Sequence, residues 1–161
     1  MITPERIRTI TDHYAEGPRL LEAAIAGIGR EEMHFRPGPE HWSIHENAIH
    51  VVDCDLLVAV RIRYILTQPG TTLVGFDQGA WARVFRYAER SVNEALSLFR
   101  ALRGTTVAVV ETAPADAWDR SIETENGPRT LERLVDHYGR HVDYHLRTIA
   151  KRRRQFADRR V

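Results

Sequence analysis

Residues 130–149 read TLERLVDHYGRHVDYHLRTI, and this stretch decides the fold. Its apolar side chains recur every three or four residues, as on one face of an α-helix: Leu131, Leu134, Tyr138, Val142, Leu146 and Ile149. Thr130 stands just before the first of them, where its hydroxyl suits an N-cap. The stretch therefore predicts a long amphipathic helix whose apolar face packs against other helices.

Three further segments have the same periodicity with start and stop signals; they cover residues 3–26, 43–67 and 91–112. The sharpest start is Ser43-Ile44-His45-Glu46, a capping box in which Ser and Glu satisfy each other's free backbone N–H groups. Ser91-Val92-Asn93-Glu94 predicts a second capping box. Thr3-Pro4 opens the first segment, and Gly17-Pro18 predicts a kink within it.

The connections between these segments contain turn-forming residues. Residues 36–39 and 71–79 predict loops, and Asp77 can cap a short helical piece that carries Trp81. Asn126-Gly127 predicts a tight turn in a small hairpin. Four amphipathic helices without alternating strands indicate an all-α fold, a four-helix bundle with a short extra helix between the second and third long helices. The length suits a single domain, residues 1–161.

The charge balance points to no particular partner, because the chain has 23 Lys and Arg and 22 Asp and Glu, which give a formal net charge of +1. Basic residues gather only near the C-terminus, at Lys151–Arg154, Arg159 and Arg160. We interpret them as a solvated end of the last helix that complements its dipole, because only Phe156 among them could stack on a base. We therefore expect no binding to nucleic acid.

The cysteine count and hydropathy suggest a compartment. Cys54 is the only cysteine, so no intrachain disulfide can form, which fits a reducing environment. Residues 1–6 lack a signal-peptide pattern, and the longest apolar stretch, residues 56–60, is far too short to span a bilayer. We expect a soluble cytoplasmic protein without a membrane partner.

Histidines provide the chemistry. His137, His141 and His145 are spaced four residues apart, so neighbours lie about 6 Å apart along one helix face. One adjacent pair can bind a single metal ion, but the outer two, about 12 Å apart, cannot easily share it. His50, flanked by apolar residues, can supply a ligand from the second helix. Converging neutral imidazoles bring lone pairs together, and a divalent metal would resolve that conflict.

These segments resemble the DinB-like (DinB/YfiT-like) superfamily. Residues 42–53, WSIHENAIHVVD, are similar to its "W-S-x-x-E-x-x-x-H-x-x-D" helix, and residues 126–131 to its "G-x-x-T-L" entry to the last helix. Residues 137–149 are similar to its "H-x-x-x-H-x-x-x-H-L-x-x-I" ending. The resemblance implies a four-helix bundle of the DinB-like type, often dimeric, with a metal site.

Matched position by position, the resemblance implies His50, His141 and His145 as metal ligands. The "H-L-x-x-I" ending places the last ligand at His145, while His137 matches a position that is often His without being a ligand. The implied metals are zinc or nickel, with open positions for water or substrate. Whether His137 replaces or supplements one of these ligands stays open.

Three functions follow as alternatives. The first is a metal-dependent enzyme, either a hydrolase using an activated water or, as the resemblance implies, a transferase that uses a low-molecular-weight thiol such as mycothiol or bacillithiol. The second is a non-catalytic, stress-associated, metal-binding homodimer. The third is a metal-free helical interaction protein. The only candidate general bases are Asp53 and Asp143, and the catalytic residues are unknown.

The other polar and aromatic residues receive plainer interpretations. Cys54 is interpreted as a small buried hydrophobe rather than a ligand, and Asp53 as a residue that orients a histidine or joins two helices. The tryptophans are expected in the core or a pocket wall: Trp42, Trp81 and Trp118. Four histidines are expected in solvent: His13, His34, His41 and His45.

Overall fold

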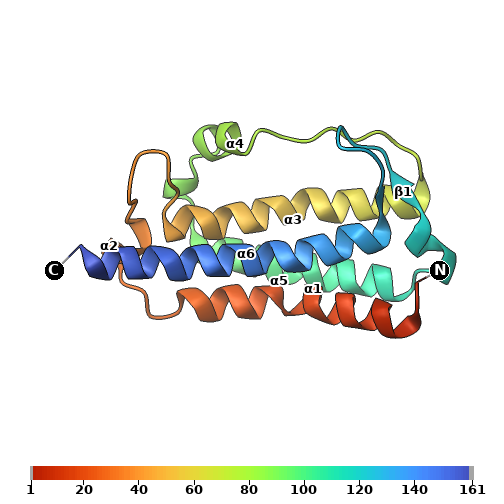
Figure 1. The fold of residues 1–161 in the computed structure, drawn as a ribbon, viewed down its shortest axis with the longest axis horizontal. Coiled ribbons are helices and arrows are strands. Elements are labelled where there is room, and N and C mark those ends of the chain that lie inside the picture. Colours follow the sequence, from red (N-terminus) through yellow and green to blue (C-terminus); the bar gives the residue numbers. More distant parts are fainter. Residues whose placement is uncertain (1, 160–161) are drawn as a thin grey trace.

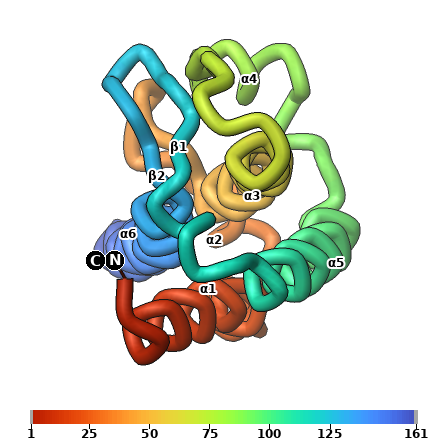
Figure 2. Tube along the Cα trace, turned by 90° about the vertical axis from the view of Figure 1, so that its right-hand side faces the viewer, coloured from red at the N-terminus to blue at the C-terminus, as the bar shows by residue number. Residues whose placement is uncertain are grey.

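Four long helices lie side by side in the computed structural model, which describes residues 2–159 (Figure 1). They are α1 (Pro4–Ile25), α3 (Ile44–Thr67), α5 (Val92–Glu111) and α6 (Leu131–Asp158). Each packs against two neighbours in the order α1–α6–α3–α5, which closes the ring seen end-on in Figure 2. The predicted all-α four-helix bundle is confirmed.

The helix directions require a long crossover. In Figure 1, α1 and α6 run toward one end of the molecule and α3 and α5 run toward the other. The connection from α3 to α5 must therefore return along the whole bundle, and it carries α4 (Gln78–Val84) and the 3₁₀ helix η1 (Tyr87–Glu89). The extra helix predicted here is α4, and Asp77 caps it by accepting a hydrogen bond from Ala80 N at 2.9 Å.

Local capping chemistry sets the helix starts. Thr3, Ser43 and Thr130 each accept a hydrogen bond from a backbone N–H of the first turn, as predicted. Ser43 and Glu46 form both halves of the capping box. Ser91 accepts from Glu94 N, which is one half of the box predicted there.

The sequence did not reveal two short helical elements, α2 (Arg30–His34) and the 3₁₀ helix η2 (Ala115–Asp119). The predicted hairpin is present as β1 (Ser121–Ile122) and β2 (Arg129–Thr130), which pair antiparallel with Ser121 opposite Thr130. Gly127 in its loop has φ +85°, a conformation that favours glycine. No described helix is both long and apolar enough to cross a membrane.

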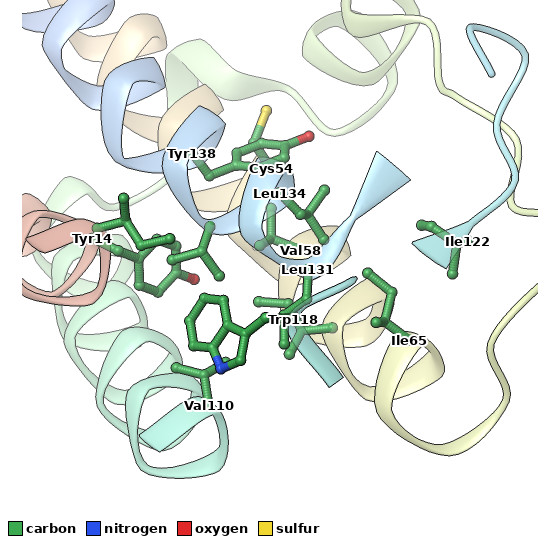
Figure 3. Packing of buried hydrophobic residues seen from close by; sticks show 13 residues of the cluster. Tyr14, Cys54, Val58, Ile65, Val110, Trp118, Ile122, Leu131, Leu134 and Tyr138 are labelled. Carbon is green, nitrogen blue, oxygen red and sulfur yellow. The ribbon is translucent and has the colours of Figure 1, made fainter. Parts of the chain in front are cut away.

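The apolar core has two parts. One surrounds Trp118, which is 1% exposed and packs among side chains of the long helices and the hairpin (Figure 3). The other lies toward the opposite end and contains Leu21, Ile49 and Phe99. Of the three tryptophans, Trp118 is therefore in the core, as expected.

A buried ion pair joins all four long helices. Arg103 of α5 donates to both carboxylate oxygens of Asp55 on α3, at 2.7 and 3.1 Å, and each side chain is 1% exposed. Arg103 also donates to the backbone carbonyls of Tyr14 on α1 and Tyr138 on α6. Gly17 leaves room for this guanidinium, because a Cβ atom there would overlap it. Helix α1 continues without interruption through Gly17-Pro18.

Two residues expected in solvent, His45 and Arg152, are buried instead. His45 is buried, because α2 packs against α3: its ring stacks on His34 at 4.5 Å and its Nε2 lies 2.9 Å from Arg90 O. In the basic C-terminal segment, Arg152 is buried and donates to Trp42 O at 3.0 Å, and Arg153 pairs with Glu32. Arg159 pairs with Glu31, and Arg160 lies outside the described residues.

Candidate metal centre

Three imidazoles meet where α3 and α6 pack together. His50 of α3 is 1% exposed, His145 of α6 is 5% exposed, and His141 is half-buried. The ring centroid of His50 lies 5.4 Å from that of His141 and 4.9 Å from that of His145. These are the three residues that the sequence resemblance implies as ligands, and the fold brings them together.

The ligand atoms of the α6 pair already have a suitable separation. Nε2 of His141 lies 3.2 Å from Nε2 of His145. Two nitrogens bound to one tetrahedral zinc at about 2.0–2.1 Å would lie about 3.3 Å apart. The pair can therefore hold one divalent ion with little rearrangement.

Asn47 fixes the orientation of His145. Nδ1 of His145 lies 2.8 Å from Oδ1 of Asn47. The amide nitrogen of Asn47 donates to Ser43 O at 2.7 Å, so its oxygen is the acceptor and His145 Nδ1 carries the proton. The lone pair of His145 is then on Nε2, toward His141. This arrangement is common around metal-ligating histidines.

Sequence reasoning missed Asn47. A signal was present, because Asn47 precedes His50 by three residues and so shares its helix face. Its role depends on contact with α6, however, and the spacing within one helix does not reveal which asparagine makes that contact.

Cys54 belongs to the same cluster. Its Sγ lies 3.4 Å from His50 Nε2, and ligand atoms of His50, Cys54 and His141 all lie within 4.8 Å of one another. Burial raises the pKa of the thiol to about 12. The structure therefore assembles four potential donors, and Cys54 is also buried in the apolar core, as expected.

The imidazoles are neutral at physiological pH. Burial, followed by the neighbouring imidazoles, lowers the pKa of His50, His141 and His145 to about 3 each. Neutral imidazole is the form that coordinates a metal. The cluster offers lone pairs rather than positive charge.

A cleft of about 440 Å³ opens onto the cluster, a volume within the usual range for small-molecule sites. Trp42 forms one wall, with its ring centroid 4.7 Å from that of His50. His137 is exposed on the rim, one turn from His141 and 6.4 Å from it between ring centroids. The cleft is lined by Glu40, His41, Trp42, Asn47, His50, Gln78, His137, His141, Tyr144, His145, Thr148 and Arg152.

The two candidate general bases lie elsewhere. Both carboxylate oxygens of Asp53 accept from Arg90 at 2.7 Å, and Asp143 pairs with His13 at 3.1 Å. Neither aspartate lines the cleft. Asp53 thus joins α3 to the segment before α5, one of the two roles expected for it, and orients no histidine in the cluster.

Comparisons with known proteins identify the family. A family model described as the DinB superfamily matches residues 13–149. A protein of Geobacillus kaustophilus (strain HTA426) named "Putative metal-dependent hydrolase" is 21% identical over 140 residues, covering 86% of this chain and 79% of its own length. A protein of Bacillus cereus (strain 03BB102) with the same name is 22% identical over 155 residues, covering 94% and 89%.

Two solved structures share the fold. YfiT from Bacillus subtilis, described as a probable metal-dependent hydrolase with an unusual four-helix bundle topology, superposes with a TM-score of 0.90 at 19% identity, over 98% of this chain and 91% of its own. A mycothiol-dependent maleylpyruvate isomerase superposes with a TM-score of 0.69 at 12% identity, over 87% of this chain and 59% of its own. At these identities the superpositions show the fold.

Proposed function

This chain belongs to the DinB superfamily, and on that premise we propose that it is a metal-dependent hydrolase with His50, His141 and His145 as ligands. Relatives of similar length that are named as metal-dependent hydrolases support the activity. The observation that carries the proposal is the 3.2 Å separation of the His141 and His145 Nε2 atoms, with His145 held by Asn47 at the base of an open cleft.

The donor set favours particular metals. Three neutral imidazoles suit zinc or nickel, and three protein ligands leave a position for water or substrate, as in catalytic zinc sites. A divalent ion bound there would supply Lewis-acid chemistry, lowering the pKa of water and polarising a substrate carbonyl. Trp42 packs against His50 on one side of the cluster, and His137, which lines the same cleft, is our candidate for the general base.

Metal content and ester hydrolysis test the proposal. Protein purified without a His-tag is expected to contain about one divalent ion per chain and to hydrolyse 4-nitrophenyl acetate. The His141→Ala/His145→Ala variant should lose both properties. Substoichiometric metal that is unchanged in this variant would overturn the proposal.

His137→Ala tests the ligand register. Since His137 lies outside the cluster, this variant should keep its metal while its kcat falls. If His137→Ala lost the metal and His145→Ala kept it, the ligand pair on α6 would lie one turn earlier than we propose.

The position of Cys54 favours a second candidate, a non-catalytic metal-binding protein. Its thiolate could add a fourth protein donor to the three imidazoles, and four protein ligands are typical of closed structural sites. Cobalt substitution separates the two candidates. A sulfur-to-cobalt charge-transfer band that Cys54→Ser abolishes would support the closed site, and its absence would support the open one.

The cleft also has room for a thiol substrate. In this alternative reaction, a low-molecular-weight thiol such as mycothiol takes the place of water as the nucleophile. The fold that this chain shares with a mycothiol-dependent isomerase is the reason to test such a thiol. With 4-nitrophenyl acetate as the electrophile, the mycothiol sulfur should then acquire the acetyl group and release 4-nitrophenol, in a reaction that depends on the metal. Product formation that is identical with and without the thiol would favour hydrolysis.

A further inference from the structure

A second pocket adjoins the cleft and is basic. It has a volume of about 140 Å³ and shares His137 with the cleft. Three arginines line it, from three elements: Arg61 of α3, Arg129 of β2 and Arg133 of α6. We propose that this pocket binds a carboxylate or phosphate group of the substrate whose reactive bond lies at the histidine cluster. The proposal rests on the proposed function and specifies its substrate class.

Two of the three guanidinium groups are available for a ligand, whereas Arg61 already donates to Val74 O at 3.1 Å and to the Tyr138 hydroxyl at 3.4 Å. Among the described residues, the side chains of Arg129 and Arg133 form no ion pair or hydrogen bond with the protein, and both are exposed. Other surface arginines, such as Arg6 and Arg100, pair with carboxylates. The charges of Arg129 and Arg133 are thus not neutralised by an ion pair within the part of the chain that the structure describes.

One acidic residue lines the pocket, and it is already bound. Glu125 accepts a hydrogen bond from Gly75 N at 2.9 Å, which ties the hairpin loop to the crossover. Three arginines and one glutamate leave a local charge of about +2, in a chain whose formal net charge is +1. Guanidinium groups bind carboxylate and phosphate through paired N–H donors, so this excess favours an oxyanion.

The size of the pocket suits one group of a larger ligand. Small-molecule sites usually measure about 300–1,000 Å³, a range that includes the cleft and excludes the pocket. A ligand that fills both would place its anionic end at the arginines and its remainder in the cleft. Leu134 and the ring of Tyr138 provide apolar contact at the anionic end.

Helix α6 defines the direction of such a ligand. Arg133, His137 and His141 follow one another at intervals of four residues and so form a row on one face. At about 1.5 Å rise per residue, Arg133 and His141 lie about 12 Å apart along the axis. A ligand lying along this row passes His137 between its two ends.

The first experiment measures anion binding and is independent of activity. Acetate and inorganic phosphate are titrated separately into the ¹⁵N-labelled full-length protein. Saturable shifts are expected in the backbone amides of residues 124–127 and in the Nε–H groups of Arg129 and Arg133. The two titrations also show which oxyanion the pocket prefers.

Variants locate the binding. Arg129→Gln/Arg133→Gln should weaken binding by at least about tenfold, because it removes two charged donors. Arg147→Gln is the matched control, since Arg147 is exposed on the same helix and lines neither cavity. Shifts that persist in the double variant, or that fall equally in the control, would overturn the proposal.

The second experiment measures specificity. The metal-loaded enzyme is assayed with 4-nitrophenyl monoesters of straight-chain dicarboxylic acids, from succinic to sebacic, and with the same compounds capped as methyl esters. The charged series should have the higher kcat/KM, with an optimum chain length. The preference should fall by at least about tenfold in Arg129→Gln/Arg133→Gln and persist in Arg147→Gln.

The two proposals fail in different ways. Hydrolysis of charged and capped esters at equal rates would contradict the anion pocket and leave the hydrolase intact. No hydrolysis of either series would contradict the hydrolase, and the anion titration would still decide whether the pocket binds an oxyanion.

Discussion

Asn47 illustrates how a single amide can prepare a metal site. Its side-chain oxygen accepts a hydrogen bond from Nδ1 of His145, and its amide nitrogen donates one to the carbonyl of Ser43, the residue that caps the same helix. The capping box thereby fixes Asn47, and Asn47 fixes the ligand. The residues that begin α3 and those that bind the proposed metal are thus one connected network.

We expect Asn47→Ala to lower metal affinity by about 10–100-fold, because the ring of His145 loses its partner. Competition with a chromogenic chelator measures this affinity. Asn93→Ala is the control, since Asn93 is exposed on α5, away from the cleft. Equal affinity in Asn47→Ala and the wild type would show that packing alone orients His145.

Acid should destabilise the metal-free protein through the buried imidazoles. Their pKa is about 3 in the folded protein, against 6.5 for an unperturbed histidine in the unfolded chain. Between these two pH values the unfolded chain therefore binds more protons than the folded protein. The free energy of unfolding therefore falls as the pH falls below about 6.5, by up to about 1.4 kcal/mol per pH unit for each imidazole.

Denaturant titrations over this pH range measure that slope. His141→Asn should reduce this slope by the contribution of about one proton, because one of the three buried imidazoles is lost. A slope that is the same in His141→Asn and the wild type would mean that other groups cause the acid sensitivity.

At the scale of elements, local and long-range features differ in how far the sequence predicts them. Caps at Thr3, Ser43 and Thr130 are local chemistry, and the sequence predicts those helix starts correctly. The burial of His45 depends on α2, five residues with little periodicity to detect. The proximity of Cys54 to His141 depends on how α3 meets α6, which spacing within either helix does not determine.

The Arg103–Asp55 pair should be a major contributor to helix packing. Asp55→Ala leaves a buried guanidinium without its counter-ion, and we expect a loss of about 3–5 kcal/mol in the free energy of unfolding. Urea denaturation measures it. Asp55→Leu/Arg103→Leu should cost less than the sum of the two single changes, since neither charge is then left alone.

Two helix glycines provide a matched test of the space that Arg103 needs. Gly17→Ala should destabilise the protein by about 1–3 kcal/mol, because the new methyl group overlaps the guanidinium. Gly104→Ala meets no atom within 4 Å and should stabilise α5 by up to about 1 kcal/mol. Thermal unfolding of both variants measures the difference. Equal effects would show that the guanidinium moves aside without cost.

At the scale of the molecule, the bundle has two neighbouring cavities, the cleft and the basic pocket, and both are lined by residues of α6. The fold class and the histidine cluster follow from periodicity and from the resemblance of the motifs, and the crossover topology becomes visible only in three dimensions. The arginine pocket also escapes sequence reasoning, because its lining comes from α3, the hairpin and α6. The homodimer stays a prediction, and analytical ultracentrifugation would measure it.

Helix α6 has a consequence for the order in which the protein is made. It supplies two of the four clustered donors and the Tyr138 carbonyl that accepts from Arg103. In a nascent chain that lacks α6, His50 and Cys54 have no imidazoles from α6 beside them. Arg103 lacks one of its hydrogen-bond acceptors, the carbonyl of Tyr138. Neither polar centre can therefore close before α6 has been synthesised, so a product terminated before Leu131 would lack both.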